Sequence, residues 1–270
     1  MADYDYWHKQ GLKPLYPEVD MERPEQRRFA GKLLIIGGNK GAFFAVANAM
    51  QEAQKMGVGE VRVLMPSSLR NQVPTTSEVY FAEAETSGAF GKNALNEMLL
   101  QAAWADAVVL IGDTGKNAET SVAFAEFMKL CEKPVFVTRD AIEAIMPDVM
   151  NWAVLREAET TLLLTMPQLQ KTLRTLYYPK VITLSMPTNQ LIETLHKFTI
   201  SYAGVSIATY HNGQIVVAKD GEVISEELGD TQWTQISLWG GSLLVQMAVL
   251  KLWNTALDTQ KVLASALIYK

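Results

Sequence analysis

The feature that most constrains this chain is a repeated alternation between short apolar runs and longer segments with helical spacing. The runs KLLIIGG, EVRVLMP, DAVVLIG and KPVFVT each lie ahead of a segment whose apolar residues recur every three or four positions. Continuous apolar runs of this length are typical of strands buried on both faces. The alternation therefore predicts an α/β fold of three layers, with a mostly parallel central sheet covered by helices on both sides.

Further strands are predicted at 160–166 (TTLLLTM), 180–185 (KVITLS) and 204–210 (GVSIATY). The alternation then breaks, because Asn212-Gly213 and Asp220-Gly221 are hairpin turn pairs flanked by alternating apolar residues. We expect a small antiparallel meander there, at one edge of the sheet, followed by two long helices from about residues 239 and 258.

The chain divides into an arm and a domain. Residues 1–30 are polar and contain Pro14, Pro17 and Pro24, which predicts an extended N-terminal arm lying on the domain or on a neighbouring subunit. Residues 31–270 show no linker, repeat or low-complexity segment and are expected to form a single domain.

Composition excludes several classes of partner. The net charge is −5 and no stripe of Lys or Arg is present, which disfavours a nucleic-acid partner. The three histidines and Cys131 lack the spacing of a zinc site, so no metal ligand set is predicted, and Cys131 itself is expected to be a buried apolar residue. We expect no signal peptide and no membrane span, hence a cytoplasmic protein.

Two glycine-containing turns follow strands and are candidate binding loops, since ligands of open α/β sheets bind beyond the carboxyl ends of the strands. The first contains Gly37, Gly38 and Asn39; it lacks the dinucleotide fingerprint, and its glycines either face an anion or allow close packing. The second runs from Gly112 through Asp113 to Lys116 and Asn117. Because Lys116 is followed by Asn rather than Ser or Thr, it is not a Walker loop.

A third candidate precedes the long apolar helix near the C-terminus. Free amides at a helix start attract anions, and Gly240, Gly241 and the amide of Ser242 could form a phosphate-binding hole. Ser242 could also be an N-cap whose hydroxyl accepts a hydrogen bond from a backbone amide two or three residues on, and both interpretations can hold together because one uses the backbone and the other the side chain.

The order of these pieces resembles the ribokinase-like fold and, more narrowly, the YjeF C-terminal type of ADP- or ATP-dependent NAD(P)H-hydrate dehydratases. The similar segments are GKLLIIGGNKGAFFAVANAM, ADAVVLIGDTGKNAET, KPVFVTRDAIEAI, LLLTMPQLQKTL and WGGSLLVQMAVL, which span residues 31 to about 255. The resemblance implies ATP or ADP as a ligand, Mg²⁺ as a companion ion, and a homo-oligomer.

The departures from that family concern its acid and base positions. Ser242 stands where the family has the Asp credited with proton transfer, and Thr138 replaces the first Asp of an aspartate-rich segment that keeps Asp140. A hydroxyl provides no general base at pH 7 without an activating neighbour. We therefore expect a divergent relative that binds a nucleotide or a nucleotide-like metabolite. Such a protein would be a pseudoenzyme. The alternatives are an active dehydratase or carbohydrate-kinase-like enzyme that uses Asp113 and Asp140, and a non-catalytic assembly protein.

Overall fold

A ten-stranded sheet organises the computed structural model, which describes residues 4–11, 13–74, 76–230 and 234–269. The strands are β1 (Trp7–Lys9), β2 (Lys32–Gly37), β3 (Glu60–Pro66), β4 (Val79–Ala82), β5 (Ala107–Gly112), β6 (Val135–Thr138), β7 (Thr160–Leu164), β8 (Val205–His211), β9 (Gln214–Lys219) and β10 (Glu222–Glu227). Their order is β1-β10-β9-β8-β7-β6-β5-β2-β3-β4. From β8 through β7, β6, β5, β2 and β3 to β4, neighbouring strands pair parallel, and β1 pairs parallel with β10. Strand β9 pairs antiparallel with both β8 and β10. The α/β fold class is confirmed.

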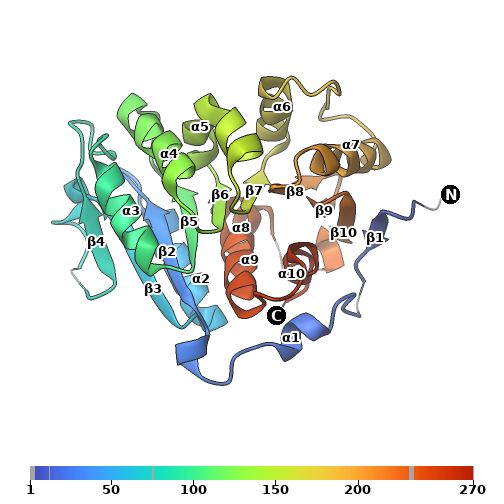
Figure 1. The fold of residues 1–270 in the computed structure, drawn as a ribbon, viewed down its shortest axis with the longest axis horizontal. Helices are drawn as coiled ribbons and strands as arrows, with labels where there is room; N and C mark the ends of the chain where they lie inside the picture. The colour runs from blue at the N-terminus through green and yellow to red at the C-terminus, as the bar shows by residue number, and fades with distance from the viewer. Residues whose placement is uncertain (1–3, 12, 75, 231–233, 270) are drawn as a thin grey trace.

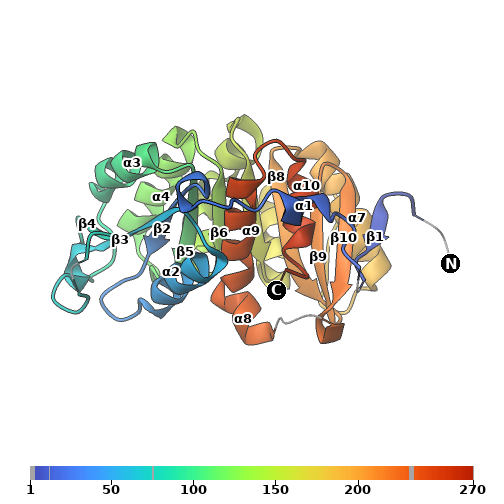
Figure 2. The same ribbon diagram turned by 90° about the horizontal axis from the view of Figure 1, so that it is seen from below.

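Helices cover both faces of the sheet (Figure 1). One layer contains α3 (Ala94–Trp104), α4 (Ala118–Leu130), α5 (Ala141–Ile145), α6 (Met166–Thr175) and α7 (Thr188–Ser201). The other contains α2 (Phe44–Met56), α8 (Gln235–Gly240), α9 (Ser242–Trp253) and α10 (Thr259–Ser265), which Figure 2 shows together on one side. Shorter turns of helix are α1 (Glu18–Met21), η1 (Arg27–Phe29), η2 (Ser67–Leu69), η3 (Met146–Asp148), the π-helical η4 (Asn151–Leu155) and η5 (Leu228–Asp230).

The core has two halves because side chains alternate along the strands. In β2, Leu34 and Ile36 belong to the half under α3–α7, whereas Leu33 and Ile35 belong to the half under α2 and α9. This is why the strands read as continuous apolar runs in the sequence. Cys131 is buried as expected, and burial raises the pKa of its thiol.

The antiparallel meander is confirmed in place and in its turns. Asn212 and Asp220 have φ of 48° and 51°, and the following Gly213 and Gly221 have φ of 81° and 85°. Positive φ at both central residues is the requirement of the hairpin turn that Asn-Gly and Asp-Gly favour.

The prediction of a strand at 180–185 is wrong. Strand β7 pairs directly with β8, so the sheet has no position for a strand between them. Residues 180–185 form a loop in which Val181 and Leu184 are exposed and only Ile182 is buried. The prediction failed because it took Val181 and Leu184 for buried strand residues, whereas both are exposed.

The N-terminal arm lies along its own chain. Strand β1 adds to the free edge of β10, where the Trp7 indole donates a hydrogen bond of 2.9 Å to the Ser225 hydroxyl. Tyr6 stacks on His196 of α7 with 3.7 Å between ring centroids. The arm is therefore not purely extended but includes β1, α1 and η1, and it closes one edge of the sheet. No helix among the described residues is long and apolar enough to cross a membrane.

Candidate functional site

Three neighbouring strands, β2, β5 and β6, end at the same edge of the sheet and bring the first two candidate loops together. The Gly38 amide donates to the Gly112 carbonyl at 2.8 Å. A side chain at Gly37 would lie 2.8 Å from the Ile111 side chain and 2.5 Å from the Gly112 carbonyl oxygen. The glycines of the first loop therefore allow close packing, which is the structural alternative that the sequence left open.

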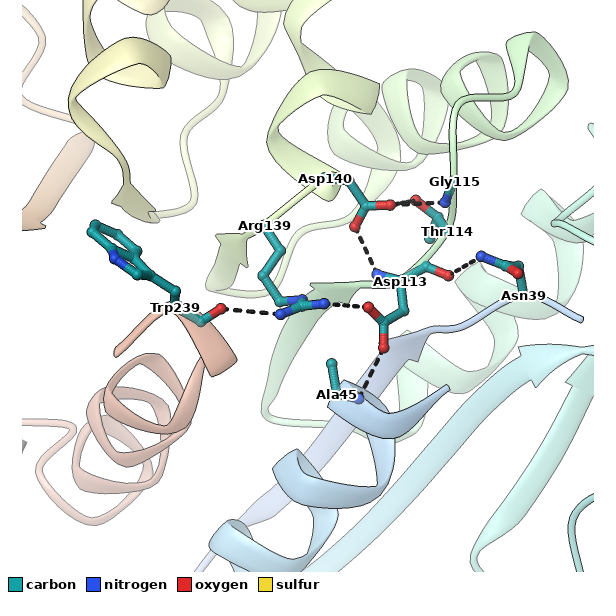
Figure 3. A network of polar contacts seen from close by, with 8 residues as sticks. All are labelled: Asn39, Ala45, Asp113, Thr114, Gly115, Arg139, Asp140 and Trp239. Carbon is teal, nitrogen blue, oxygen red and sulfur yellow. Dashed lines mark hydrogen bonds and ion pairs between the residues drawn. The ribbon is translucent and has the colours of Figure 1, made fainter. Parts of the chain in front are cut away.

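Asn39 has a linking role rather than an exposed one. Its side-chain amide donates to the Asp113 carbonyl at 2.5 Å, and its side-chain oxygen accepts from the Gly41 amide at 2.7 Å. The Asn39 amide is itself bonded to the Ala42 carbonyl. The first loop thus uses its polar groups to hold itself against the second (Figure 3).

Asp113 is fixed through both carboxylate oxygens. Its backbone is left-handed, with φ of 59°, and its side chain is only 10% exposed. One oxygen accepts from the Ala45 amide in the first turn of α2 at 2.9 Å, and the other forms an ion pair with Arg139. The carboxylate therefore joins β5, α2 and β6.

Asp140 closes the turn that follows β5. Its carboxylate accepts from the Asp113 amide at 2.6 Å, from the Gly115 amide at 2.7 Å and from the Thr114 hydroxyl at 3.3 Å (Figure 3). Any side chain at Gly112, where φ is 87°, would collide with this carboxylate. The two aspartates singled out in the sequence are thus brought together, each already engaged by partners in the chain.

Arg139 is a residue of this network that the sequence analysis missed. It has a left-handed φ of 57°, and besides its ion pair with Asp113 it donates to the Trp239 carbonyl in α8 at 3.1 Å. It therefore connects the β5 turn to the loop before α9. The available signal was a cation placed directly before Asp140, at the carboxyl end of a buried strand.

The third loop is built differently from the predicted hole. Gly240 ends a short helix, α8, and the Gly241 amide already donates to the Leu238 carbonyl at 3.0 Å. The Val245 amide donates to the Gly241 carbonyl at the start of α9. The amides of Ser242, Leu243 and Leu244 therefore belong to the first turn, where amides have no partner within the helix. Gly241 is the N-cap and no side-chain cap bond forms, so the alternative of Ser242 as N-cap is wrong. Whether the loop binds phosphate stays a prediction that now depends on Ser242 and the residues after it.

A cavity of about 810 Å³ opens beside these turns, at the carboxyl ends of β5, β6 and β7. We call it the lysine cavity, and its lining is Gly115, Lys116, Asn117, Ala118, Ser121, Asp140, Glu143, Ala144, Gln168 and Lys171. Lys116 and Asn117 were predicted for this edge, whereas Lys171 and Gln168 were not, because α6 lies more than fifty residues further along the chain.

Polar bonds hold the walls of the lysine cavity in place. Asn117 caps α4 by accepting from the Thr120 amide at 3.1 Å. Gln168 donates to the Arg139 carbonyl at 2.9 Å and to the Glu143 carboxylate at 3.0 Å, which ties α6 to the β6 turn. The acidic groups around the cavity are therefore engaged, and among the described residues no cluster of three or more His, Cys, Asp or Glu fits a metal ion.

Comparison with known proteins yields the fold. No family model matches the chain, and no curated protein matches it by sequence. Among solved structures, a ribokinase-like superfamily protein from Enterococcus faecalis superposes with a TM-score of 0.65 at 12% identity, covering 98% of this chain and 86% of that one. The chain has the ribokinase-like fold.

Two further neighbours of this fold carry a stated activity. An ADP/ATP-dependent NAD(P)H-hydrate dehydratase from Bacillus subtilis, co-crystallised with ATP and Mg²⁺, has a TM-score of 0.59 at 14% identity and covers 96% of this chain and 87% of that one. An ADP complex of B. subtilis pyridoxal kinase has a TM-score of 0.51 at 13% identity and covers 87% and 88%. At these identities the likeness establishes the ribokinase-like fold that the sequence motifs implied, and that expectation is confirmed.

The two glycines before α9 give a matched test of this loop. Gly241 has φ of 93°, and an added side chain would collide with Ile111, whereas Gly240 is the last residue of α8 with open space around it. We expect Gly241→Ala to lower the free energy of unfolding by about 2–4 kcal/mol, from left-handed strain and overpacking. Gly240→Ala should change it by less than about 1 kcal/mol. Urea denaturation measures both, and equal effects would contradict the described loop.

Proposed function

We propose that the protein binds a nucleotide or another phosphorylated small molecule in the lysine cavity, without catalysing the dehydratase or kinase reactions of its structural neighbours. The observation that carries this proposal is the pair of lysines, Lys116 and Lys171, on the cavity wall. Among the described residues, neither ammonium group lies within 4.0 Å of a carboxylate. Two cations left unpaired beside one cavity favour an anionic ligand.

The start of α4 adds to this attraction. Asn117 is the N-cap and Ala118 begins a helix of 13 residues, and both line the cavity. The amides of a first helical turn carry partial positive charge and point toward a bound anion. A cavity of about 810 Å³ has the size of sites for small-molecule ligands.

The hydrogen bonds and the ion pair of the two carboxylates support binding without catalysis. Asp113 and Asp140 accept bonds from backbone amides, the Thr114 hydroxyl and Arg139, so proton abstraction by either would first break contacts that hold the loops together. Ser242 offers a hydroxyl where the resembling family has an acid, and among the described residues no hydrogen bond links it to a His or Lys. The proposal therefore assigns no acid–base role to Asp113, Asp140 or Ser242.

The nucleotides found with two neighbours support the choice of ligand class. The B. subtilis dehydratase was crystallised with ATP and Mg²⁺, and the pyridoxal kinase was crystallised as an ADP complex. ATP and ADP are therefore the first ligands to test, and because the described side chains do not form a metal site, Mg²⁺ would arrive with the phosphates.

Binding is tested by thermal unfolding with ATP and ADP, with and without Mg²⁺. At a ligand concentration of ten times Kd, we expect stabilisation of about 1.4 kcal/mol, which raises Tm by about 3 °C for a chain of this size. Lys116→Ala and Lys171→Ala should each reduce the shift at the same concentration. Lys180→Ala is the matched control, because Lys180 is exposed and lies outside the cavity lining. An unchanged shift in both cavity variants would contradict this site.

The absence of catalysis is tested with hydrated NADH in the presence of ADP or ATP. We expect no return of NADH absorbance with the wild-type chain, because no free base is available at residue 242. Ser242→Asp, which supplies a carboxylate at that position, is the variant expected to gain turnover. Turnover by the wild type that is lost in Asp113→Asn would instead establish the alternative in which Asp113 and Asp140 do the acid–base work.

A further inference from the structure

A second cavity, of about 490 Å³, lies at the opposite ends of the strands from the lysine cavity. We call it the arginine cavity, and its lining is Arg23, Pro24, Arg27, Gln54, Gly57, Val58 and Trp253. Gly57 ends α2 and Val58 leads into β3, so the cavity is at the amino ends of the strands, away from the lysine cavity. The N-terminal arm forms one wall, and the last turn of α9 forms the other.

The charged groups on this wall are both cations. Among the described residues, neither guanidinium lies within 4.0 Å of a carboxylate. Arg27 uses its Nε to donate to the Gly59 carbonyl at 2.8 Å, and Arg23 lies 5.6 Å from the ring centroid of Trp253. These contacts orient the two side chains and leave most of their donors available.

The end of α2 does not consume these donors. The Gly57 amide donates to the Gln54 carbonyl at 3.0 Å, and the Val58 amide donates to the Ala53 carbonyl at 3.1 Å. This left-handed glycine cap satisfies the Ala53 and Gln54 carbonyls from within the backbone. Among the described residues, no hydrogen bond joins either guanidinium to a carbonyl of α2.

Trp253 lines the cavity beside Arg23 and provides a reporter for it. The residue is only 7% exposed, and its indole Nε1 is buried without a hydrogen-bond acceptor among the described residues. Because this N–H has almost no accessible surface, a ligand in the open cavity would meet the ring of Trp253 and not its N–H. The arginine cavity thus combines two guanidinium groups with the ring of Trp253, over which Arg23 lies.

We propose that the arginine cavity binds the phosphate group of a small phosphorylated metabolite. Guanidinium groups match a phosphate through paired hydrogen bonds, and the volume accommodates a ligand larger than phosphate alone. The site stands apart from the lysine cavity and does not depend on the function proposed for it. Helices α2 and α9, which pack against each other, extend from one edge of the sheet to the other between the two sites.

The test follows the indole N–H signal of Trp253 in a ¹H–¹⁵N spectrum while inorganic phosphate replaces chloride at constant ionic strength. The signal is assigned with Trp253→Phe. We expect a saturable shift whose midpoint concentration rises at least about tenfold in Arg23→Gln, because a charge-assisted hydrogen bond is lost. Arg28→Gln is the matched control, since Arg28 stacks on Phe29 outside the lining, and its midpoint should stay within about twofold.

Two outcomes would overturn the proposal. One is no shift of the Trp253 signal up to about 10 mM phosphate, a concentration that detects even weak sites. The other is a shift that Arg23→Gln and Arg28→Gln leave equally intact. If Arg23→Gln lowers Tm while phosphate has no effect on the wild type, Arg23 acts only to anchor the arm. Arg27→Gln repeats the measurement with the second guanidinium.

Discussion

The ion pair between Asp113 and Arg139 is the interaction on which the arrangement of the loops depends. Both residues have left-handed backbones, with φ of 59° and 57°, and both follow directly on buried strands. Such conformations cost free energy for residues other than glycine, so they persist where surrounding contacts enforce them. Here the Asp113 carboxylate receives Arg139 and the Ala45 amide, while Asp140 receives the Asp113 amide, and Arg139 reaches the Trp239 carbonyl. One small network therefore connects β5, β6, α2 and α8, and it sets the positions of the turns around the lysine cavity.

Under the proposed function, this network holds the loops of the fold in place without taking part in acid–base chemistry. The carboxylates of Asp113 and Asp140 accept hydrogen bonds from backbone amides, and these contacts hold the turns in place in a chain with Ser at residue 242. Binding needs only the cations and amides at the carboxyl edge of the sheet, whereas catalysis needs a base that is free to take a proton. The two cavities lie at opposite ends of the strands and have one feature in common. In each, two cations without a carboxylate partner among the described residues line a wall that backbone hydrogen bonds hold in place.

Much of the fold could be predicted because burial on both faces makes β2, β3, β5 and β6 continuous apolar runs, and Asn212-Gly213 specifies a hairpin turn. The segment 180–185 has the same local pattern but no place in the sheet, and that information lies in the pairing of β7 with β8. Asp113 could be identified because it follows a strand in a glycine-containing turn, and Asp140 because its segment resembles an aspartate-rich segment of the dehydratase family. Arg139 and Lys171 could not be assigned to the site, since their roles come from contacts with α8 and from the position of α6. Helix α8 was hidden because its glycines suggested an open loop.

The most direct measurement of the central claim is a double-mutant cycle on the unfolding free energy with Asp113→Asn, Arg139→Gln and the double variant. Asparagine tolerates the left-handed backbone and can still accept from the Ala45 amide, so the cycle isolates the contact with Arg139. If the pair holds the loops together, the two substitutions should be non-additive by about 1 kcal/mol or more, as for residues in one network. Additivity within about 0.3 kcal/mol would show that the two side chains act independently, and it would contradict the structural role assigned to Asp113.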